Sequence, residues 1–144
     1  MGILDAPQKV YPRGELVHAE TNQVRVVGST TIGAIPGLDI TVTVGDRPVR
    51  LTGTLPYGTA NAAPTTLVVT IQDVTGGGAG TEVARFAHDF ATTGTNSLRP
   101  LSARIPAGGG VRRYQLRAGL FSGTNAVDLG IASTRPATFR AEEI

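Results

Sequence analysis

The chain has 144 residues, with 13 Lys and Arg against 11 Asp and Glu, a formal net charge of +2 at pH 7 and no cysteine. Without cysteine there is no disulfide, no thiolate metal site and no cysteine nucleophile. The charges are scattered, and no segment approaches the roughly 20 apolar residues of a membrane span, so we expect one domain that binds neither nucleic acid nor membrane.

The first 20 residues differ from the rest of the chain. "MGILDAPQKVYPRGE" has two prolines and no periodicity, so residues 1–20 are predicted to form an extended arm. The stretch lacks the basic and apolar regions of a signal peptide, and the chain is therefore expected to be made in the cytoplasm. Its apolar residues are unusual for a free tail. Two uses stay open, packing on the arm's own domain or lying on a neighbouring subunit, and the candidate anchors are Ile3, Leu4, Val10 and Tyr11.

Alternation of apolar and polar residues predicts strands from residue 24 onward, because successive side chains of a strand point to opposite faces. In "QVRVVG" this places Val24 and Val26 inside and Arg25 outside. In "LDITVTV" four apolar side chains face the core while Asp39 and two threonines face outward, as in a half-buried antiparallel strand. The inward residues predicted for this strand and for "RPVRLTGTL" are Leu38, Ile40, Val42, Val44, Val49, Leu51, Gly53 and Leu55.

The same alternation continues to the last residue. "TEVARFAHDF" places His88 on the face of Phe86 and Phe90, which predicts a partly buried structural histidine. In "ATFRAEEI" the inward positions are Phe139 and Ala141, with Ile144 expected to help close the core. The inward residues predicted for three other strands are Leu67, Val69 and Ile71 in "TTLVVTIQD"; Tyr114, Leu116, Ala118 and Leu120 in "VRRYQLRAGL"; and Val127, Leu129 and Ile131 in "NAVDLGIA".

Turn residues separate these strands at even intervals. Gly-rich and Pro-Gly pairs occur between the alternating runs, and glycine reaches the positive φ angles that tight turns require. No stretch keeps the apolar spacing of a helix. The sequence therefore predicts an all-β fold, an antiparallel β-sandwich of jelly-roll type over residues 21–144, preceded by the extended arm.

Residues that could carry chemistry are few and poorly arranged. His88 and Asp89 resemble part of a catalytic triad, but neighbours on a strand face opposite sides. The loop "GGGAGTE" lacks the lysine of a phosphate-binding loop and joins two strands. Arg113 and Arg117 would share one strand face with Arg112 on the other, so they do not predict one basic patch. We predict a non-enzymatic protein with no catalytic, cofactor or metal site.

Five segments of the chain carry a resemblance to a known group of proteins. "PGLDITV" reads as a "PGL-x-[IV]-T-V" strand, "GDRP" as a "G-x-RP" turn, and "YQLRA" as a "Y-x-[LV]-R-A" strand; the Gly/Thr hairpin "SGTN" and the closing "ATFRAEEI" follow. The resemblance covers about residues 24–144. The chain resembles the small jelly-roll structural proteins of tailed phages that infect actinobacteria.

The resemblance implies a virion protein without enzymatic activity, often a homotrimer built like the jelly rolls of the tumour-necrosis-factor type. In this group the module commonly closes a longer tail protein or fibre, whereas this chain has no shaft, heptad repeat or collagen-like repeat before the sandwich. That difference favours a capsid decoration (cement) protein, which binds the major capsid protein or other virion proteins on the outside of the head and uses the arm as its anchor. The alternative is a minor tail or tail-fibre-tip protein that binds a host receptor. A glycan-binding module without a phage role also stays open.

Overall fold

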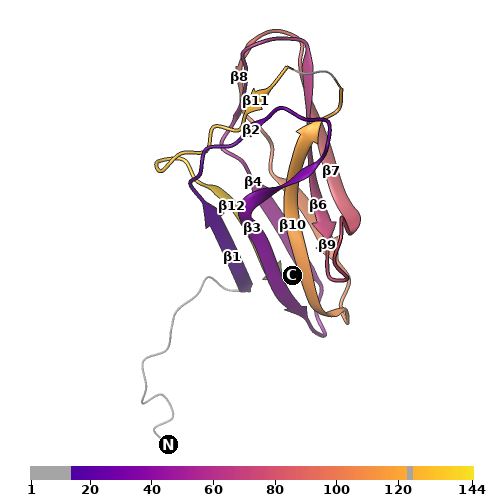
Figure 1. The fold of residues 1–144 in the computed structure, drawn as a ribbon. Helices are drawn as coiled ribbons and strands as arrows, with labels where there is room; N and C mark the ends of the chain where they lie inside the picture. Colours follow the sequence, from indigo (N-terminus) through magenta and orange to yellow (C-terminus); the bar gives the residue numbers. More distant parts are fainter. Residues whose placement is uncertain (1–13, 123–124) are drawn as a thin grey trace, which may run out of the picture.

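The computed structural model describes residues 14–122 and 125–144, and these form strands and connecting loops without a helix. Two four-stranded antiparallel sheets face each other, with a smaller four-stranded sheet at one end (Figure 1). The first sheet contains β1 (Glu15–Thr21), β12 (Ala137–Glu143), β4 (Val49–Thr54) and β9 (Leu101–Ile105). The second contains β3 (Gly33–Val44), β10 (Gly110–Leu120), β6 (Thr65–Asp73) and β7 (Thr81–Phe90). The small sheet contains β2 (Val26–Val27), β11 (Val127–Asp128), β5 (Gly58–Ala60) and β8 (Gly94–Asn96).

The strand order of the two large sheets is that of a jelly roll. In space the orders are β1-β12-β4-β9 and β3-β10-β6-β7. When the eight long strands are numbered along the chain and the short ones are left out, the order is 1-8-3-6 in one sheet and 2-7-4-5 in the other. This order is the double Greek key of the jelly roll. The predicted fold class is confirmed. The last strand, β12, lies between β1 and β4, so the alternation near the end of the sequence belongs to a central strand.

The core lies between the two large sheets, where the apolar positions of the alternating strands meet. Leu38, Leu51, Leu116 and Phe139 are each 0% exposed, as the alternation predicts. On β12 Phe139 has Ala19 and Gly53 as its cross-strand partners. A Cβ at Gly53 would lie 2.6 Å from Leu116, so this glycine leaves the room that the large core side chains fill.

Three of the inward positions predicted from the sequence, Val24, Val26 and Ile144, are wrong. Val24 is 70% exposed and Val26 is 52% exposed, whereas Val27 is buried. Strand β2 has only two residues and pairs Val27 with Val127 of β11. The buried side chain is therefore one residue later than predicted, and such a shift moves the predicted inward side chains to the solvent face. Near the C-terminus, Ile144 is also exposed, because β12 ends at Glu143 and only the Ile144 backbone is held, by its N–H donating to the Pro48 carbonyl at 3.1 Å.

The boundary predicted between arm and sandwich is also wrong. Residues 15–20, assigned to the arm, belong to β1 and pair with residues of β12. Their alternating burial shows that inward contacts begin before the first strand predicted from the sequence. The sandwich therefore includes residues 15–20, and the Gly14 carbonyl before them accepts the N–H of Glu143 at 2.7 Å. The predicted anchors Ile3, Leu4, Val10 and Tyr11 lie outside the described residues.

The loop between β2 and β3 crosses the outer face of the second large sheet at the end of β10 (Figure 1). The N–H of Leu120 donates to the Ser29 carbonyl at 2.9 Å, and a Cβ at Gly119 would lie 2.9 Å from Ile32 Cγ1 and 3.0 Å from its Cα. Val68, the cross-strand partner of Gly119 on β6, is 1% exposed although it points away from the core. Part of this outer face is therefore covered by the chain itself.

Candidate interaction surfaces

The described residues bring together no group of three His, Asp or Glu side chains that could hold a metal ion. They also form no helix that could span a membrane. His88 packs its ring edge against Phe90 at 4.8 Å between centroids and has Asn96 Nδ2 3.1 Å from its Nε2. Asp89 points elsewhere and accepts a hydrogen bond from Thr66 Oγ1 at 2.6 Å. His88 and Asp89 therefore contact different partners.

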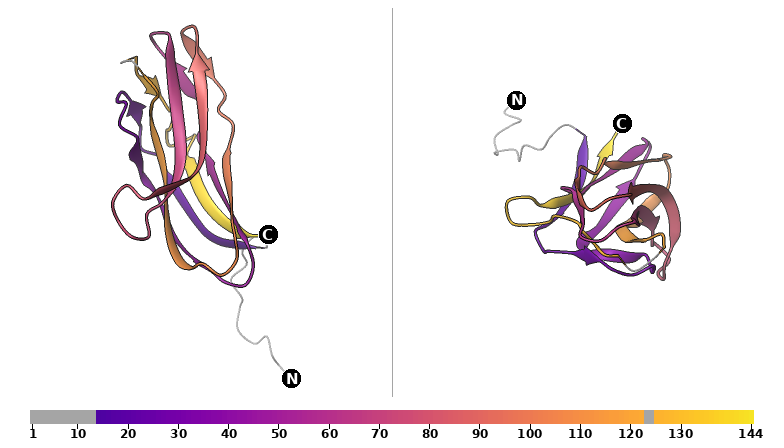
Figure 2. Two further views of the ribbon diagram at one scale, coloured as in Figure 1. Left: turned by 90° about the vertical axis from the view of Figure 1, so that its right-hand side faces the viewer. Right: turned by 90° about the horizontal axis from the view of Figure 1, so that it is seen from above.

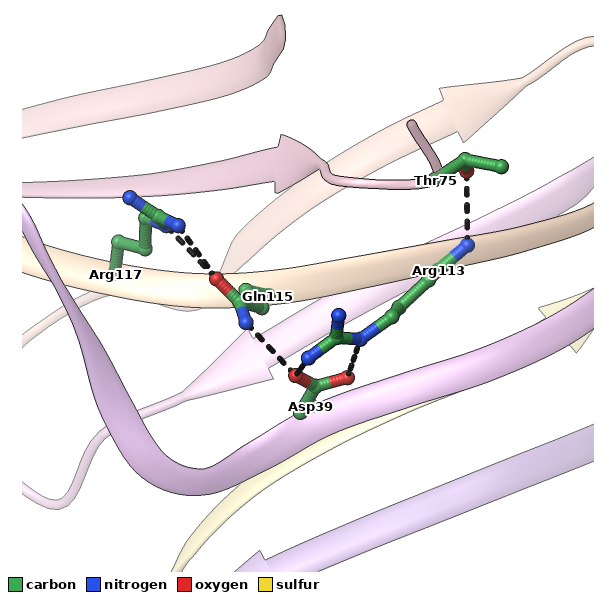
Figure 3. Close-up of polar contacts among 5 residues, drawn as sticks. All are labelled: Asp39, Thr75, Arg113, Gln115 and Arg117. Atoms are coloured by element: carbon green, nitrogen blue, oxygen red, sulfur yellow. Dashed lines mark hydrogen bonds and ion pairs between the residues drawn. The ribbon is translucent and has the colours of Figure 1, made fainter. Parts of the chain in front are cut away.

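A polar network lies on the outer face of the second large sheet (Figure 3). Asp39 of β3 accepts two hydrogen bonds from Arg113 of β10, from Nε at 2.9 Å and from Nη2 at 2.6 Å. Gln115 donates to the same carboxylate at 2.8 Å and accepts two hydrogen bonds from Arg117, at 3.0 and 2.7 Å. Register explains the meeting, because Asp39 and Gln115 are direct cross-strand partners.

Within the network, Arg113 neutralises the charge of Asp39. The bidentate hydrogen bonds from Arg113 hold the pKa of Asp39 below its ordinary value of 3.8 and raise the pKa of the guanidinium, because each charge favours the other. Arg112 points to the opposite side and approaches Asp73 at 3.7 Å, which confirms that Arg112 and Arg113 do not form one patch. Arg117 binds the neutral Gln115 amide and forms no ion pair among the described residues, so its charge is the one that this network leaves uncompensated.

Replacing Asp39 with asparagine is expected to lower the free energy of unfolding at pH 7 by about 0.5–1 kcal/mol, a small loss because 34% of the side chain is exposed. Since folding lowers its pKa, the carboxylate stabilises the fold above its unfolded pKa near 3.8, and this contribution is lost as the pH falls through the folded pKa. Wild type and variant should thus differ in urea unfolding at pH 7 and converge below pH 3.8.

Asp46 provides the control for this prediction, because it is exposed and makes no side-chain hydrogen bond or ion pair within residues 14–122 and 125–144. Asp46→Asn should leave the unfolding curve unchanged at both pH values. An equal loss in the two variants would show that the Asp39 network does not stabilise the fold.

The outer face of the first large sheet has a different charge pattern. Across β1, β12, β4 and β9, the register aligns Glu15, Glu142, Arg50 and Arg104 in one row. The adjacent outward row consists of His18, Arg140, Thr52 and Ser102. Among the described residues, none of the three arginines in these rows forms an ion pair, while Glu15 approaches His18 Nδ1 at 3.3 Å. This face is built partly from small hydroxyl side chains, and its three arginines carry charges without an ion-pair partner among the described residues.

A cleft of about 610 Å³ opens where β1 ends and β3 begins. It is lined by residues 20–23, by Pro36 and Gly37, and by Ser133 and Pro136. The lining combines a carboxylate, two amides and two hydroxyls, with the Thr21 hydroxyl accepting the N–H of Gln23 at 3.3 Å. Such a lining can bind water or a hydroxyl-rich molecule, and it contains no aromatic side chain on which a sugar ring could stack.

Sequence reasoning did not identify the Asp39 network or the charged row of the first sheet. The alternation placed Asp39, Arg113 and Arg117 on outward positions, but it did not show that β3 and β10 are neighbours. The four charges of the row likewise come from four strands that are far apart in the chain. Only the jelly-roll strand order could have brought either set together from the sequence.

No family model and no curated protein sequence matches the chain. Among solved structures it is similar to the CBM22-1 xylan-binding domain of Paenibacillus barcinonensis Xyn10C, at 12% identity and a TM-score of 0.40 over 94% of this chain and 98% of that one. It is also similar to the CBM22-1–GH10 modules of Clostridium thermocellum Xyn10B, at 10% identity and a TM-score of 0.40, over 90% of this chain and 28% of that one. A third similarity, to the enzymatically active domain of tailspike protein 4 of bacteriophage CBA120, has 13% identity and a TM-score of 0.34 over 89% and 19% of the two chains. At these TM-scores the function has to be argued from the residues of this chain.

Proposed function

We propose that this chain is a non-enzymatic structural protein of a phage virion, a capsid decoration protein that binds the outside of the head as a homotrimer. The observation that supports the proposal is where the phage-like segments fall in the fold. Residues 36–44 form most of β3, residues 114–118 lie in β10, and residues 137–144 contain β12. β3 and β10 are hydrogen-bonded neighbours, and β12 is an inner strand of the opposite sheet, so the segments contribute strands to both large sheets of the jelly roll.

The geometry of the chain ends suits attachment to a lattice. The start of β1 and the C-terminus lie at the same end of the sandwich, opposite the small β2-β11-β5-β8 sheet (Figure 1; Figure 2, left view). Residues 1–13 are therefore joined to the sandwich at that end. An anchor there would hold one end against the major capsid protein or other virion proteins and leave the small sheet pointing outward. Binding only the assembled lattice stabilises it by mass action, and trimerisation strengthens weak contacts through avidity.

The proposal is tested by the copy number of the protein in purified virions, measured by quantitative mass spectrometry relative to the major capsid protein. A truncation tests the role of residues 1–13 as the anchor. Hundreds of copies are expected, and removing residues 1–13 should abolish rebinding to stripped particles while circular dichroism shows an intact sandwich. About a dozen copies or fewer would instead favour the tail protein and receptor binding. Absence from virions would overturn both roles, and undiminished rebinding of the truncated chain would exclude the arm as the anchor.

A further inference from the structure

The charged row on the outer face of the first large sheet is divided into an acidic and a basic half. Glu15 on β1 and Glu142 on β12 form one half, and Arg50 on β4 and Arg104 on β9 form the other. The burial of Leu51, Ala103 and Ala141, the chain neighbours of Arg50, Arg104 and Glu142, confirms that these three charged side chains point outward. Glu15 reaches the same face through a bulge in β1 and contacts His18 there.

This arrangement is unfavourable in a single copy. Like charges directly opposite each other across a pair of strands destabilise a sheet, and the row contains two such pairs, Glu15 beside Glu142 and Arg50 beside Arg104. Glu142 and Arg50 are also cross-strand partners, yet they form no ion pair among the residues that the structure describes. On the other large sheet, by contrast, Arg113 and Arg85 are each bound to a carboxylate. Glu142, Arg50 and Arg104 of the row therefore have no ion-pair partner among the described residues.

We propose that this face binds the same face of a second copy about a two-fold axis that runs along the strands between β12 and β4. Such an axis reverses the strand order, so β12 of one copy lies over β4 of the other, and β1 lies over β9. Glu142 of each copy then meets Arg50 of the other, and Glu15 meets Arg104, so four opposite-charge contacts form in one row. A guanidinium can bind each carboxylate through two parallel hydrogen bonds. This self-complementarity is the defining property of a two-fold interface.

The neighbouring row permits the close approach. Under the same axis Arg140 lies over Thr52 and His18 over Ser102, so each long side chain faces a small hydroxyl residue rather than a like charge. A continuous polyanion would be a poorer occupant, because the acidic half of the row would repel it. The inference does not depend on the virion role. In a trimeric decoration protein, the two-fold contact would join neighbouring trimers.

Charge reversal at this interface gives a test with a built-in rescue. In Arg50→Glu the row carries acids at both positions 50 and 142, and in Glu142→Arg it carries bases at both. Each variant should associate with itself about tenfold more weakly than wild type in sedimentation experiments at low salt, because each copy then faces its own charge. An equimolar mixture of the two should recover association, since every acid again meets a base. High salt should weaken the association of the wild type and of the mixture alike.

Matched controls come from the opposite face, where Glu82→Arg and Arg85→Glu alter an ion pair of the same type without touching the row. These variants should self-associate like wild type and gain nothing on mixing. The inference is overturned if wild type stays monomeric, if the row variants associate normally, or if mixing restores nothing. A trimer whose mass is unchanged by both row substitutions would overturn this two-fold contact and leave the proposed homotrimer standing.

Discussion

Replacing Phe139 with alanine is expected to lower the free energy of unfolding by about 3–5 kcal/mol. Phe139 is 0% exposed at the centre of the first large sheet, and its cross-strand partners Ala19 and Gly53 are too small to fill the space that its ring would leave. The loss combines the transfer of the ring to water with the cavity that remains between the sheets. Urea unfolding followed by circular dichroism would measure it.

Phe121 is the control for this substitution, because its ring is 69% exposed. Phe121→Ala should change the free energy of unfolding by less than about 0.5 kcal/mol. If Phe139→Ala does not fold, Phe139→Leu keeps most of the volume and should show a smaller loss in the same direction. Equal effects at positions 121 and 139 would contradict the burial that the fold assigns to β12.

Replacing Gly119 with valine is expected to lower the free energy of unfolding by about 2–3 kcal/mol. A Cβ at this position would lie 3.0 Å from the Cα and 3.2 Å from the backbone N of Ile32, and the two γ-methyl groups would come closer still. Backbone cannot rotate aside as a flexible side chain can. The loop between β2 and β3 must therefore lift, which breaks the hydrogen bond from Leu120 to the Ser29 carbonyl.

Gly76 offers the matched control, because a Cβ there would meet nothing within 4 Å. Gly76→Val should change the thermal midpoint little, whereas Gly119→Val should lower it clearly. Hydrogen exchange would locate the effect, with faster exchange of the Leu120 amide in the Gly119 variant alone. Unchanged protection of that amide would show that the loop does not rest on Gly119.

Alternation in the sequence predicted which side chains are buried in the long strands, but it did not do so in the short ones. It correctly predicted the buried positions of β3 and of β10, where many residues in succession follow one pattern. It failed for Val24 and Val26, because a strand of two residues has no period to read. On β6 the outward residues Val68 and Thr70 are buried, and the β2–β3 loop lies against Gly119 beside Val68. No local pattern in the sequence reports such cover.

The candidate surfaces show the same limit, because they join residues that are far apart in the sequence. The sequence placed Arg113 and Asp39 on outward faces, but their ion pair joins residues 74 positions apart, and only the strand order makes them neighbours. The row from Glu15 to Arg104 needs the register of three separate strand pairs. The anchors predicted in residues 1–13 lie beyond the described residues and stay a prediction.

The central place of β12 also bears on how the protein is made. During synthesis, every other strand leaves the ribosome before β12 does, yet β1 and β4 have no direct pairing and need β12 between them. Until that strand emerges, a nascent chain exposes two unpaired edges and the apolar surface that Phe139 later covers. We therefore expect the sandwich to close only after translation of its last strand, with folding limited by a long-range insertion rather than by growth from the N-terminus.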